Sequence, residues 1–531
     1  MTRLGYACQI WARTMATSRN EAAAKKRQVA GSFLFKIPNG DHTRAKVALF
    51  RRSDKVRTYK GKLAPCSGSV ESSDAGPLAT ALREISEETS LQESSLSLLR
   101  VGKPYTFADR SIGREWSINP FAFRIKDASE GGVGEEGIKL DWEHDGVEWF
   151  DPMQVKGSDE FGGVPRLIDS LRRVWPEYNL GPQAGQVLTK GLQILRDNHQ
   201  HGARELATTA VETLRDVILQ LGKAPIDEAW WWNIRMAAWH ICQARPSMNS
   251  AITSSITKAL GKIHGIYKAE TIEDKVREMT ESLSQQLDER NTMSDRICLS
   301  FFDYIRSEIL PPDPTERGIS ILTLSLSSTI SRTIQLVASR LGIPIDLRVL
   351  ESRPLFEGVT LAAKLLQEKL PESKLKVTVY SDASVALAAR DVDVLLLGAD
   401  RLSSTGDVDN KIGSLPAVLS ARYVAFGAKV VVASDTEKIA GPGSTDEHKS
   451  EENDPSELTQ AWKGTAGAPE VIENALLHDD PKVTIKNTYF EWVPAKYIDA
   501  YATDEGIWNA VQIQDRSARV ANEAIRYFED L

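Results

Sequence analysis

The sequence has no long uninterrupted apolar stretch and few cysteines. A membrane-spanning helix needs about 18 to 20 consecutive apolar residues, and no segment of the 531-residue chain approaches that length. The four cysteines, Cys8, Cys66, Cys242 and Cys298, are far apart and form no CxxC pair. Their spacing argues against a zinc knuckle and against a disulfide framework. We therefore expect neither an integral membrane protein nor a membrane partner, and a reducing compartment fits best.

Positive charge is also in deficit. The chain has 65 Lys and Arg against 73 Asp and Glu, which gives a formal net charge of −8. No global field would draw it to a phosphate backbone, so nucleic acid is not an expected partner. Basic residues do collect in residues 1–27, with six Lys or Arg against Glu21 alone. This segment predicts a disordered basic tail or a transit peptide, and hence a cytoplasmic protein with a mitochondrial destination as the alternative.

The pattern of apolar residues divides the rest of the chain into three parts, in keeping with its length. Strand-like runs and single helices over residues 28–180 predict a mixed α/β domain. Apolar residues recur at helical spacing over 186–310, which predicts a helical domain. Strand-like runs alternate with helices over 318–531, which predicts a Rossmann-like, doubly wound parallel sheet. Within that last part, the polar segment 441–460 predicts a flexible surface insertion.

A short segment with the sequence PLATALREISEETSL, residues 77–91, carries a cluster of glutamates. Pro77 fits a first helical turn, and the spacing predicts a helix through Glu88 with an apolar face of Leu78, Leu82 and Ile85, to which Thr89 is a candidate addition. Glu84, Glu87 and Glu88 share another face, where like charges repel by a few tenths of a kcal/mol per pair. A divalent ion bound by these carboxylate oxygens would reverse that sign. By itself the pattern is more typical of a solvated acidic face.

The surrounding sequence, GSVESSDAGPLATALREISEETSL, resembles the Nudix box. The core Arg-Glu-apolar-x-Glu-Glu is present as REISEE, and Gly68 matches the opening glycine of the motif. Asp74 stands in place of the first Glu, and Ser90 stands where the family has its closing glycine. The resemblance covers roughly residues 27–180 and implies an α/β/α sandwich.

The resemblance also implies an activity. Nudix enzymes hydrolyse a nucleoside diphosphate linked to another moiety, so the expected partner is a small molecule of that type and the expected cofactor is Mg²⁺ or Mn²⁺. Glu84, Glu87 and Glu88 match the metal ligands, with Glu84 or Glu87 acting on the attacking water. Arg83 matches the residue that orients a carboxylate through a charge-assisted hydrogen bond.

A second group of polar residues follows the apolar run near residue 395. Asp400 is predicted at the carboxyl end of a buried strand, where open parallel sheets bind ligands, and Asn410 and Lys411 follow it. The alternative is purely structural, with Asp400 capping a loop and Asn410 and Lys411 starting a helix.

Five segments between residues 244 and 506, including this group, resemble the translation initiation factor 2B alpha/beta/delta family. That family includes methylthioribose-1-phosphate isomerase and ribose-1,5-bisphosphate isomerase. They read ARPSMNSAI, ILTLSLSST, SRPLFEG, GADR with GDVDNKIG, and NTYFEWVPAKYIDAYATDEG. The resemblance runs from about residue 200 to the C-terminus. It implies homodimerisation through the C-terminal domain and a site for a phosphorylated sugar or nucleotide, built from Arg245, Ser325, Arg353, Glu357, Asp400, Asn410 and Lys411.

Ser325 departs from the isomerase pattern, because the isomerases use a cysteine at this position within a Thr-His-Cys segment. Here the segment reads Thr323-Leu324-Ser325. A serine without an adjacent base does not easily replace a thiolate. We therefore expect ligand binding to survive and aldose to ketose isomerisation to be lost.

The leading hypothesis is a Nudix-type hydrolase fused to an initiation factor 2B-like module. Two alternatives stay open. In one, the chain is a non-catalytic regulator or scaffold that associates with subunits of initiation factor 2 or 2B. In the other, it is a sugar-phosphate isomerase that uses Asp400 without the cysteine.

Overall fold

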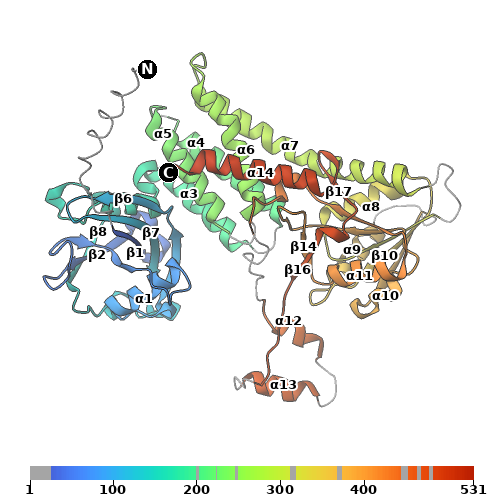
Figure 1. The fold of residues 1–531 in the computed structure, drawn as a ribbon, viewed down its shortest axis with the longest axis horizontal. Helices are drawn as coiled ribbons and strands as arrows, with labels where there is room; N and C mark the ends of the chain where they lie inside the picture. The colour runs from blue at the N-terminus through green and yellow to red at the C-terminus, as the bar shows by residue number, and fades with distance from the viewer. Residues whose placement is uncertain are drawn as a thin grey trace, which may run out of the picture. The chain divides into compact units, whose positions relative to one another are not determined.

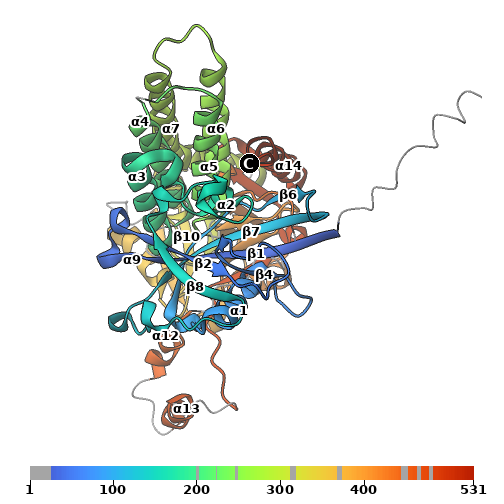
Figure 2. The same cartoon turned by 90° about the vertical axis from the view of Figure 1, so that its left-hand side faces the viewer.

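The computed structural model divides into two compact units, one up to Gln186 and one from Val187 to Asp530. The division falls inside helix α3, Glu177–Asp197, whose path is broken at Gly181. The predicted tail of residues 1–27 lies almost wholly outside the described part of the chain (Figures 1 and 2). The structure describes residues 25–198, 202–222, 224–245, 249–310, 318–367, 374–443, 453–462, 468–477 and 482–531.

The first unit is built on a mixed sheet. Its main path has the order β3-β2-β1-β7-β5, with β4 paired to β1, β6 to β7 and β8 to β2. The two longest strands, β1 and β7, run parallel to each other. The strands are β1 Lys25–Lys36, β2 Lys46–Arg52, β3 Leu63–Ala64, β4 Cys66–Ser69, β5 Leu96–Val101, β6 Tyr105–Asp109, β7 Arg114–Ile125 and β8 His144–Phe150, and the helices besides α3 are α1 Pro77–Thr89 and α2 Leu167–Val174.

Helices cover both faces of this sheet because alternate residues of its central strands are apolar on each side. On one face Phe33, Phe35 and Leu49 pack with residues of α2 such as Leu171. On the other face Leu34, Ala48 and Phe50 pack with Ala81 and Ile85 of α1. This arrangement confirms the predicted α/β/α sandwich.

Helix α1 begins at Pro77 as predicted, but its buried face differs from the expected one. Leu78 is 38% exposed, whereas Ile85 is buried, and with it Thr80, Ala81, Glu88 and Thr89. The prediction of an apolar face containing Leu78 is therefore wrong. Small side chains at Thr80 and Ala81 let the helix lie close to β1 and β4, and Leu78 falls outside that contact.

The second unit contains a helical part and a sheet part. Helices α4, α6 and α7 pack on one another, and α14 packs on α5 and α6 (Figures 1 and 2). A buried ion pair between Arg290 of α7 and Glu437 joins the helical part to the sheet part. No helix among the described residues is long and apolar enough to cross a membrane. These helices are α4 Ala203–Gln220, α5 Glu228–Gln243, α6 Asn249–Lys268, α7 Lys275–Tyr304 and α14 Ala510–Phe528.

The described residues of the sheet part form a seven-stranded sheet of order β11-β10-β9-β12-β15-β17-β18, parallel except for β18. Helices α7, α8 and α9 pack on one face, and α10, α11 and α14 on the other. This confirms the predicted doubly wound sheet. Its strands are β9 Ile319–Thr323, β10 Ile345–Leu350, β11 Leu375–Tyr380, β12 Val394–Leu397, β15 Lys429–Ala433, β17 Ala500–Thr503 and β18 Gly506–Trp508, and its helices are α8 Ser328–Arg340, α9 Glu357–Gln367, α10 Val385–Ala388 and α11 Ser414–Val424.

A small antiparallel sheet of order β13-β14-β16 lies outside this main path. Two short helices, α12 and α13, lie in the chain between β15 and β16. The strands are β13 Arg401–Leu402, β14 Val408–Lys411 and β16 Phe490–Val493, and the helices are α12 Ser456–Thr459 and α13 Ala468–Leu477.

The polar segment 441–460, predicted as a flexible insertion, is only partly described, since residues 444–452 lie outside the described set. Its described end is held in place. Asn487 donates from Nδ2 to the Asp454 carbonyl at 2.7 Å and to Glu457 Oε2 at 2.9 Å. Tyr489 donates from its hydroxyl to the same carboxylate. The local sequence does not reveal these distant partners, and the flexibility of segment 441–460 stays a prediction.

Ser90, the residue at the closing-glycine position, ends helix α1 in the left-handed conformation with φ 63°. Glycine adopts this conformation without the steric cost that a Cβ brings. Ser90→Gly should therefore raise the free energy of unfolding of the first unit by about 0.5–1 kcal/mol. The matched control is Ser86→Gly inside the same helix, which should lower it by about 1 kcal/mol. Equal effects of the two substitutions in urea unfolding would contradict this explanation.

Candidate functional site

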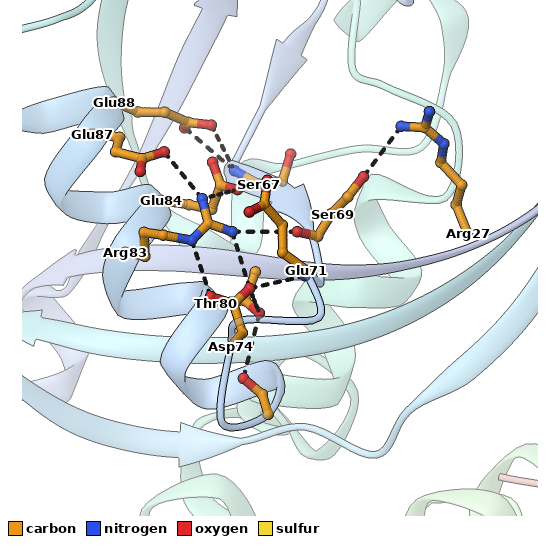
Figure 3. A network of polar contacts seen from close by, with 11 residues as sticks. Arg27, Ser67, Ser69, Glu71, Asp74, Thr80, Arg83, Glu84, Glu87 and Glu88 are labelled. Carbon is orange, nitrogen blue, oxygen red and sulfur yellow. Dashed lines mark hydrogen bonds and ion pairs between the residues drawn. The ribbon is translucent and has the colours of Figure 1, made fainter.

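Arg83 organises the carboxylates of helix α1. Its Nη1 donates to Glu84 Oε1 at 2.8 Å and to Glu87 Oε2 at 3.1 Å. Its Nε and Nη2 each donate to Asp74 at 3.1 Å. Figure 3 shows the guanidinium between the glutamates on one side and Asp74 on the other. This contact with Arg83 holds the pKa of Asp74 well below its usual range. Asp74 thus serves as the anchor of Arg83, although it stands in the family's Glu position.

Glu88, which follows Glu87 in helix α1, is buried against strand β4. Both of its carboxylate oxygens lie 3.3 Å from the Ser67 N–H (Figure 3). The whole residue is 2% exposed, whereas the Glu87 side chain is 58% exposed. The sequence suggested that the three glutamates share one face of the helix. In the structure their environments differ. Glu84 lies between the two extremes, with a side chain that is 15% exposed.

Gly68 is required by the position of Glu84. A Cβ at Gly68 would lie 1.8 Å from Glu84 Oε1, so any other residue would push the carboxylate away. The close approach gives a physical reason for the glycine that the sequence matched to the opening of the box. Glu84 and Gly68 both line a cavity of about 520 Å³ in the first unit, a size typical of small-molecule sites.

The floor of this cavity is formed by one face of the strands β1, β7 and β6. In the sheet register, Trp116 of β7 lies between Arg27 of β1 and Phe107 of β6. Two residues further along β7, Ile118 lies between Val29 of β1 and Tyr105 of β6. All six residues line the cavity, as does Arg114, whose guanidinium carbon lies 5.4 Å from the Trp116 ring centroid. Arg27 also donates from Nη1 to Ser69 Oγ at 3.3 Å (Figure 3). We call these six residues and Arg114 the cavity floor.

The cavity floor was not predicted from the sequence. The floor residues are every second residue of three strands, β1, β6 and β7. These strands are not all neighbours in the chain, and only their pairing brings the residues together. Arg52 and Glu143 also line the cavity and were not singled out.

The carboxylates of Glu84 and Glu143, which line the cavity, and of the neighbouring Glu88 carry negative charge that the protein does not fully balance. Burial raises the pKa of Glu84, an effect that Arg83 opposes and Glu143 reinforces. Burial likewise raises the pKa of Glu88 well above its usual range and raises the pKa of Glu143. Carboxylate oxygens are the ligands that Mg²⁺ and Mn²⁺ prefer. By charge and ligand type the residues fit such an ion, although no three acidic, His or Cys side chains converge on one point among the described residues.

A buried histidine adjoins Glu88 and was not singled out as a site residue. His144 Nε2 lies 3.9 Å from Glu88 Oε2, and its Nδ1 lies 3.7 Å from Asp141 Oδ1, both beyond hydrogen-bond distance. Burial lowers the pKa of His144 to about 4, so the ring is neutral at pH 7. A neutral ring offers Glu88 no counter-charge.

In the second unit, four residues predicted for the second site lie close together. Ser325 follows β9, Glu357 follows β10 and Asp400 follows β12, which are adjacent strands at the point where the strand order reverses. Lys411 Nζ lies 2.7 Å from Glu357 Oε2. The residues thus meet at the carboxyl edge of the sheet, the usual ligand position in this architecture.

The other three predicted residues have different surroundings. Asn410 donates from Nδ2 to Ser414 Oγ at 2.9 Å. Arg353 donates from its main-chain N–H to Asp382, and its guanidinium carbon lies 5.9 Å from the Phe356 ring centroid. Arg245 is buried and donates to the main-chain carbonyl of Asn198, at the end of α3.

Ser325 has a carboxylate neighbour that its sequence neighbours do not reveal. Its hydroxyl donates to Glu357 Oε2 at 3.1 Å, and its backbone is left-handed with φ 67°. The expectation of a serine without an adjacent base is therefore wrong. The same Glu357 oxygen is also paired with Lys411. Asp400 is half-buried, and desolvation raises its pKa.

The substitution Glu88→Gln tests whether the buried Glu88 carboxylate lowers the free energy of unfolding of the first unit. Because burial raises the pKa of Glu88, the folded state holds the proton more tightly than the unfolded state. The stability of the first unit should fall as pH rises from the ordinary Glu range through the raised value. The Gln variant lacks this fall and, in EDTA at pH 8, should be more stable than wild type by about 1–3 kcal/mol. The measurement is calorimetric unfolding at pH 5 and pH 8.

The control for this experiment is Glu136→Gln, which removes an exposed carboxylate from the same unit. It should leave the pH dependence unchanged. A stability difference between Glu88→Gln and wild type that is the same at both pH values would contradict the prediction.

Comparison with known proteins identifies both halves of the chain. The model of the initiation factor 2 subunit family matches residues 199–510, and the model of the Nudix domain matches residues 33–174. Methylthioribose-1-phosphate isomerase of Exiguobacterium sibiricum is 32% identical over 179 residues, which cover 32% of this chain and 45% of that protein. Ribose 1,5-bisphosphate isomerase of Haloferax volcanii is 32% identical over 165 residues, 31% of this chain and 45% of that protein.

The chain spans less than half the length of these curated relatives. Among solved structures, the tetrameric eIF2B-beta2-delta2 complex from C. thermophilum has a TM-score of 0.46 and 16% identity, covering 65% of this chain and 98% of that one. The family match covers more than half of the sequence, and both predicted resemblances are confirmed. The chain therefore belongs to the initiation factor 2 subunit family and carries a Nudix domain in its first unit.

Proposed function

We propose that the Nudix domain is a Mg²⁺- or Mn²⁺-dependent hydrolase of a nucleoside diphosphate linked to another group. The observation that carries this proposal is a single cavity lined both by the carboxylates of Glu84 and Glu143 and by the aromatic and arginine side chains of the cavity floor. A planar base can stack on the floor while arginine side chains meet phosphate oxygens. The diphosphate would then lie toward Glu84, where bond cleavage is expected.

The roles of the acidic residues follow from their surroundings. Glu84 and Glu88 would hold the ion, with Glu87 as a more exposed ligand. A bound divalent ion neutralises the diphosphate and lowers the pKa of a water molecule. Arg83 fixes the position of the Glu84 carboxylate and is itself fixed by Asp74. Glu84 is the acidic residue of the box that lines the cavity, so we assign the influence on the attacking water to Glu84 rather than to Glu87.

We propose that the second part of the chain binds a phosphorylated sugar or nucleotide at the carboxyl edge of its sheet and forms a homodimer. The whole chain would then consist of the Nudix domain at 28–180, the helical domain at 186–310 and the sheet domain at 318–531. Ser325 in the cysteine position speaks against isomerisation. Association with initiation factor 2B-like subunits is the second candidate function, and it is favoured by the family match.

Hydrolysis of a panel of nucleoside diphosphate-linked compounds by the full chain tests the enzyme. We expect turnover that requires Mg²⁺ or Mn²⁺ and a kcat/KM that falls by about 10²–10³ in Glu84→Gln, typical of losing one group that stabilises developing charge. Glu87→Gln should have a smaller effect because its side chain is more exposed. The control Glu136→Gln should match wild type. No metal-dependent, mutation-sensitive turnover of any compound would overturn the proposal.

Substitutions in the cavity floor test the nucleoside half of the substrate. Phe107→Ala and Trp116→Leu should each raise KM by roughly 5- to 100-fold, since base stacking contributes about 1–3 kcal/mol, with less change in kcat. A diphosphate ester that lacks a base is the control substrate and should be hydrolysed equally by variants and wild type. Equal losses on both kinds of substrate would indicate a structural defect and contradict the assignment of the floor.

A further inference from the structure

The ammonium group of Lys411 is enclosed by the protein. Its side chain is 4% exposed, and Nζ lies 2.7 Å from Glu357 Oε2. The rings of Tyr489 and Phe490 cover it further, with centroids 4.4 and 5.6 Å from Nζ. A ligand anion that approached Lys411 would therefore meet Glu357 in the position that a phosphate oxygen needs.

The charges around Lys411 leave little attraction for an anion. Asp400 is half-buried, and Lys438, Asp409, Lys411 and Glu357 all act electrostatically on it. Lys438 donates to the Ala399 carbonyl at 2.7 Å and so faces this same group. Three carboxyl groups thus accompany two ammonium groups. With Glu357 in place, an incoming phosphate finds no unbalanced ammonium group among them and meets like charge in a desolvated site.

We propose that Glu357 is an internal counter-ion that occupies the anion position at Lys411 and must leave that position before a phosphorylated ligand can bind. The inference rests on the proposed function of the second part of the chain as a phosphate-ligand site, and it assigns Glu357 as the residue that limits affinity there. Glu357 thereby selects for ligands whose phosphate gains more free energy from its contacts than the protein loses with the Lys411–Glu357 ion pair. Neutral sugars do not compete with it.

The two partners of this ion pair differ in their freedom to move. Lys411 lies in β14, where it pairs with Phe490 of β16, and its side chain is almost fully buried. Glu357 is the first residue of α9, and its side chain is 25% exposed. Rotation of the Glu357 side chain toward solvent therefore frees the ammonium group without moving a strand. The hydroxyl of Ser325, which donates to the same oxygen, is freed in the same step.

Calorimetric titration of the full chain with inorganic phosphate, ribose 5-phosphate and ribose tests the proposal. We expect Glu357→Gln to bind inorganic phosphate and ribose 5-phosphate on the order of tenfold more tightly than wild type, as for removal of one competing charged hydrogen bond. Ribose should bind both proteins equally. Adding Lys411→Met to Glu357→Gln should abolish the gain, which would locate it at Lys411.

Two further variants complete the design. Glu505→Gln removes an exposed carboxylate from the same unit and controls for the change in net charge. Glu357→Ala gives the same readout if Glu357→Gln fails to fold. Phosphate affinities of wild type and Glu357→Gln within twofold of each other, or a lower affinity in the variant, would overturn the role of Glu357 and leave phosphate binding intact. No binding of either phosphorylated probe by any of the proteins would overturn both this inference and the proposed phosphate-ligand site.

Discussion

Helix α1 holds carboxylates where water cannot fully stabilise their charge, and the site of the Nudix domain depends on this constraint. One guanidinium, that of Arg83, contacts Asp74, Glu84 and Glu87, while Glu88 has an N–H and a neutral histidine beside it. Burial therefore favours protonation, or a cation, at Glu84 and Glu88. Gly68 belongs to the same arrangement, because only a residue without Cβ admits the Glu84 carboxylate so close to β4.

The second unit meets the same problem in a different way. There the carboxylate of Glu357 has a buried ammonium partner, Lys411, and the charges are nearly matched within the protein. By charge and ligand type the carboxylates of the Nudix domain fit a divalent cation, whereas in the sheet site Lys411 is paired with Glu357, the group that we propose a phosphate replaces. The first arrangement favours metal-assisted chemistry, and the second favours selective binding. Ser325, in the position of the isomerase thiol, is consistent with that division of roles.

The sequence predicts the architecture well because its signals are local. Short β-rich runs predict the strands, helical spacing predicts α4 to α7, and the Glu spacing locates the carboxylates of α1. Contacts between distant segments escape such reasoning. Pairing of β1, β7 and β6 brings Arg27, Trp116 and Phe107 together, and the fold brings Glu357 to Ser325. The error at Leu78 has the same origin, since apolar spacing does not show where small side chains allow a helix its closest contact.

Binding of Mn²⁺ to the full chain, followed by electron paramagnetic resonance, tests the carboxylate site most directly because it needs no knowledge of the substrate. Wild type should bind the ion saturably, and the double variant Glu84→Gln, Glu88→Gln should bind it about tenfold more weakly or not at all, as for loss of groups that determine metal affinity. The control Glu136→Gln should match wild type. Equal Mn²⁺ binding by wild type and the double variant would contradict the assignment of these glutamates as metal ligands.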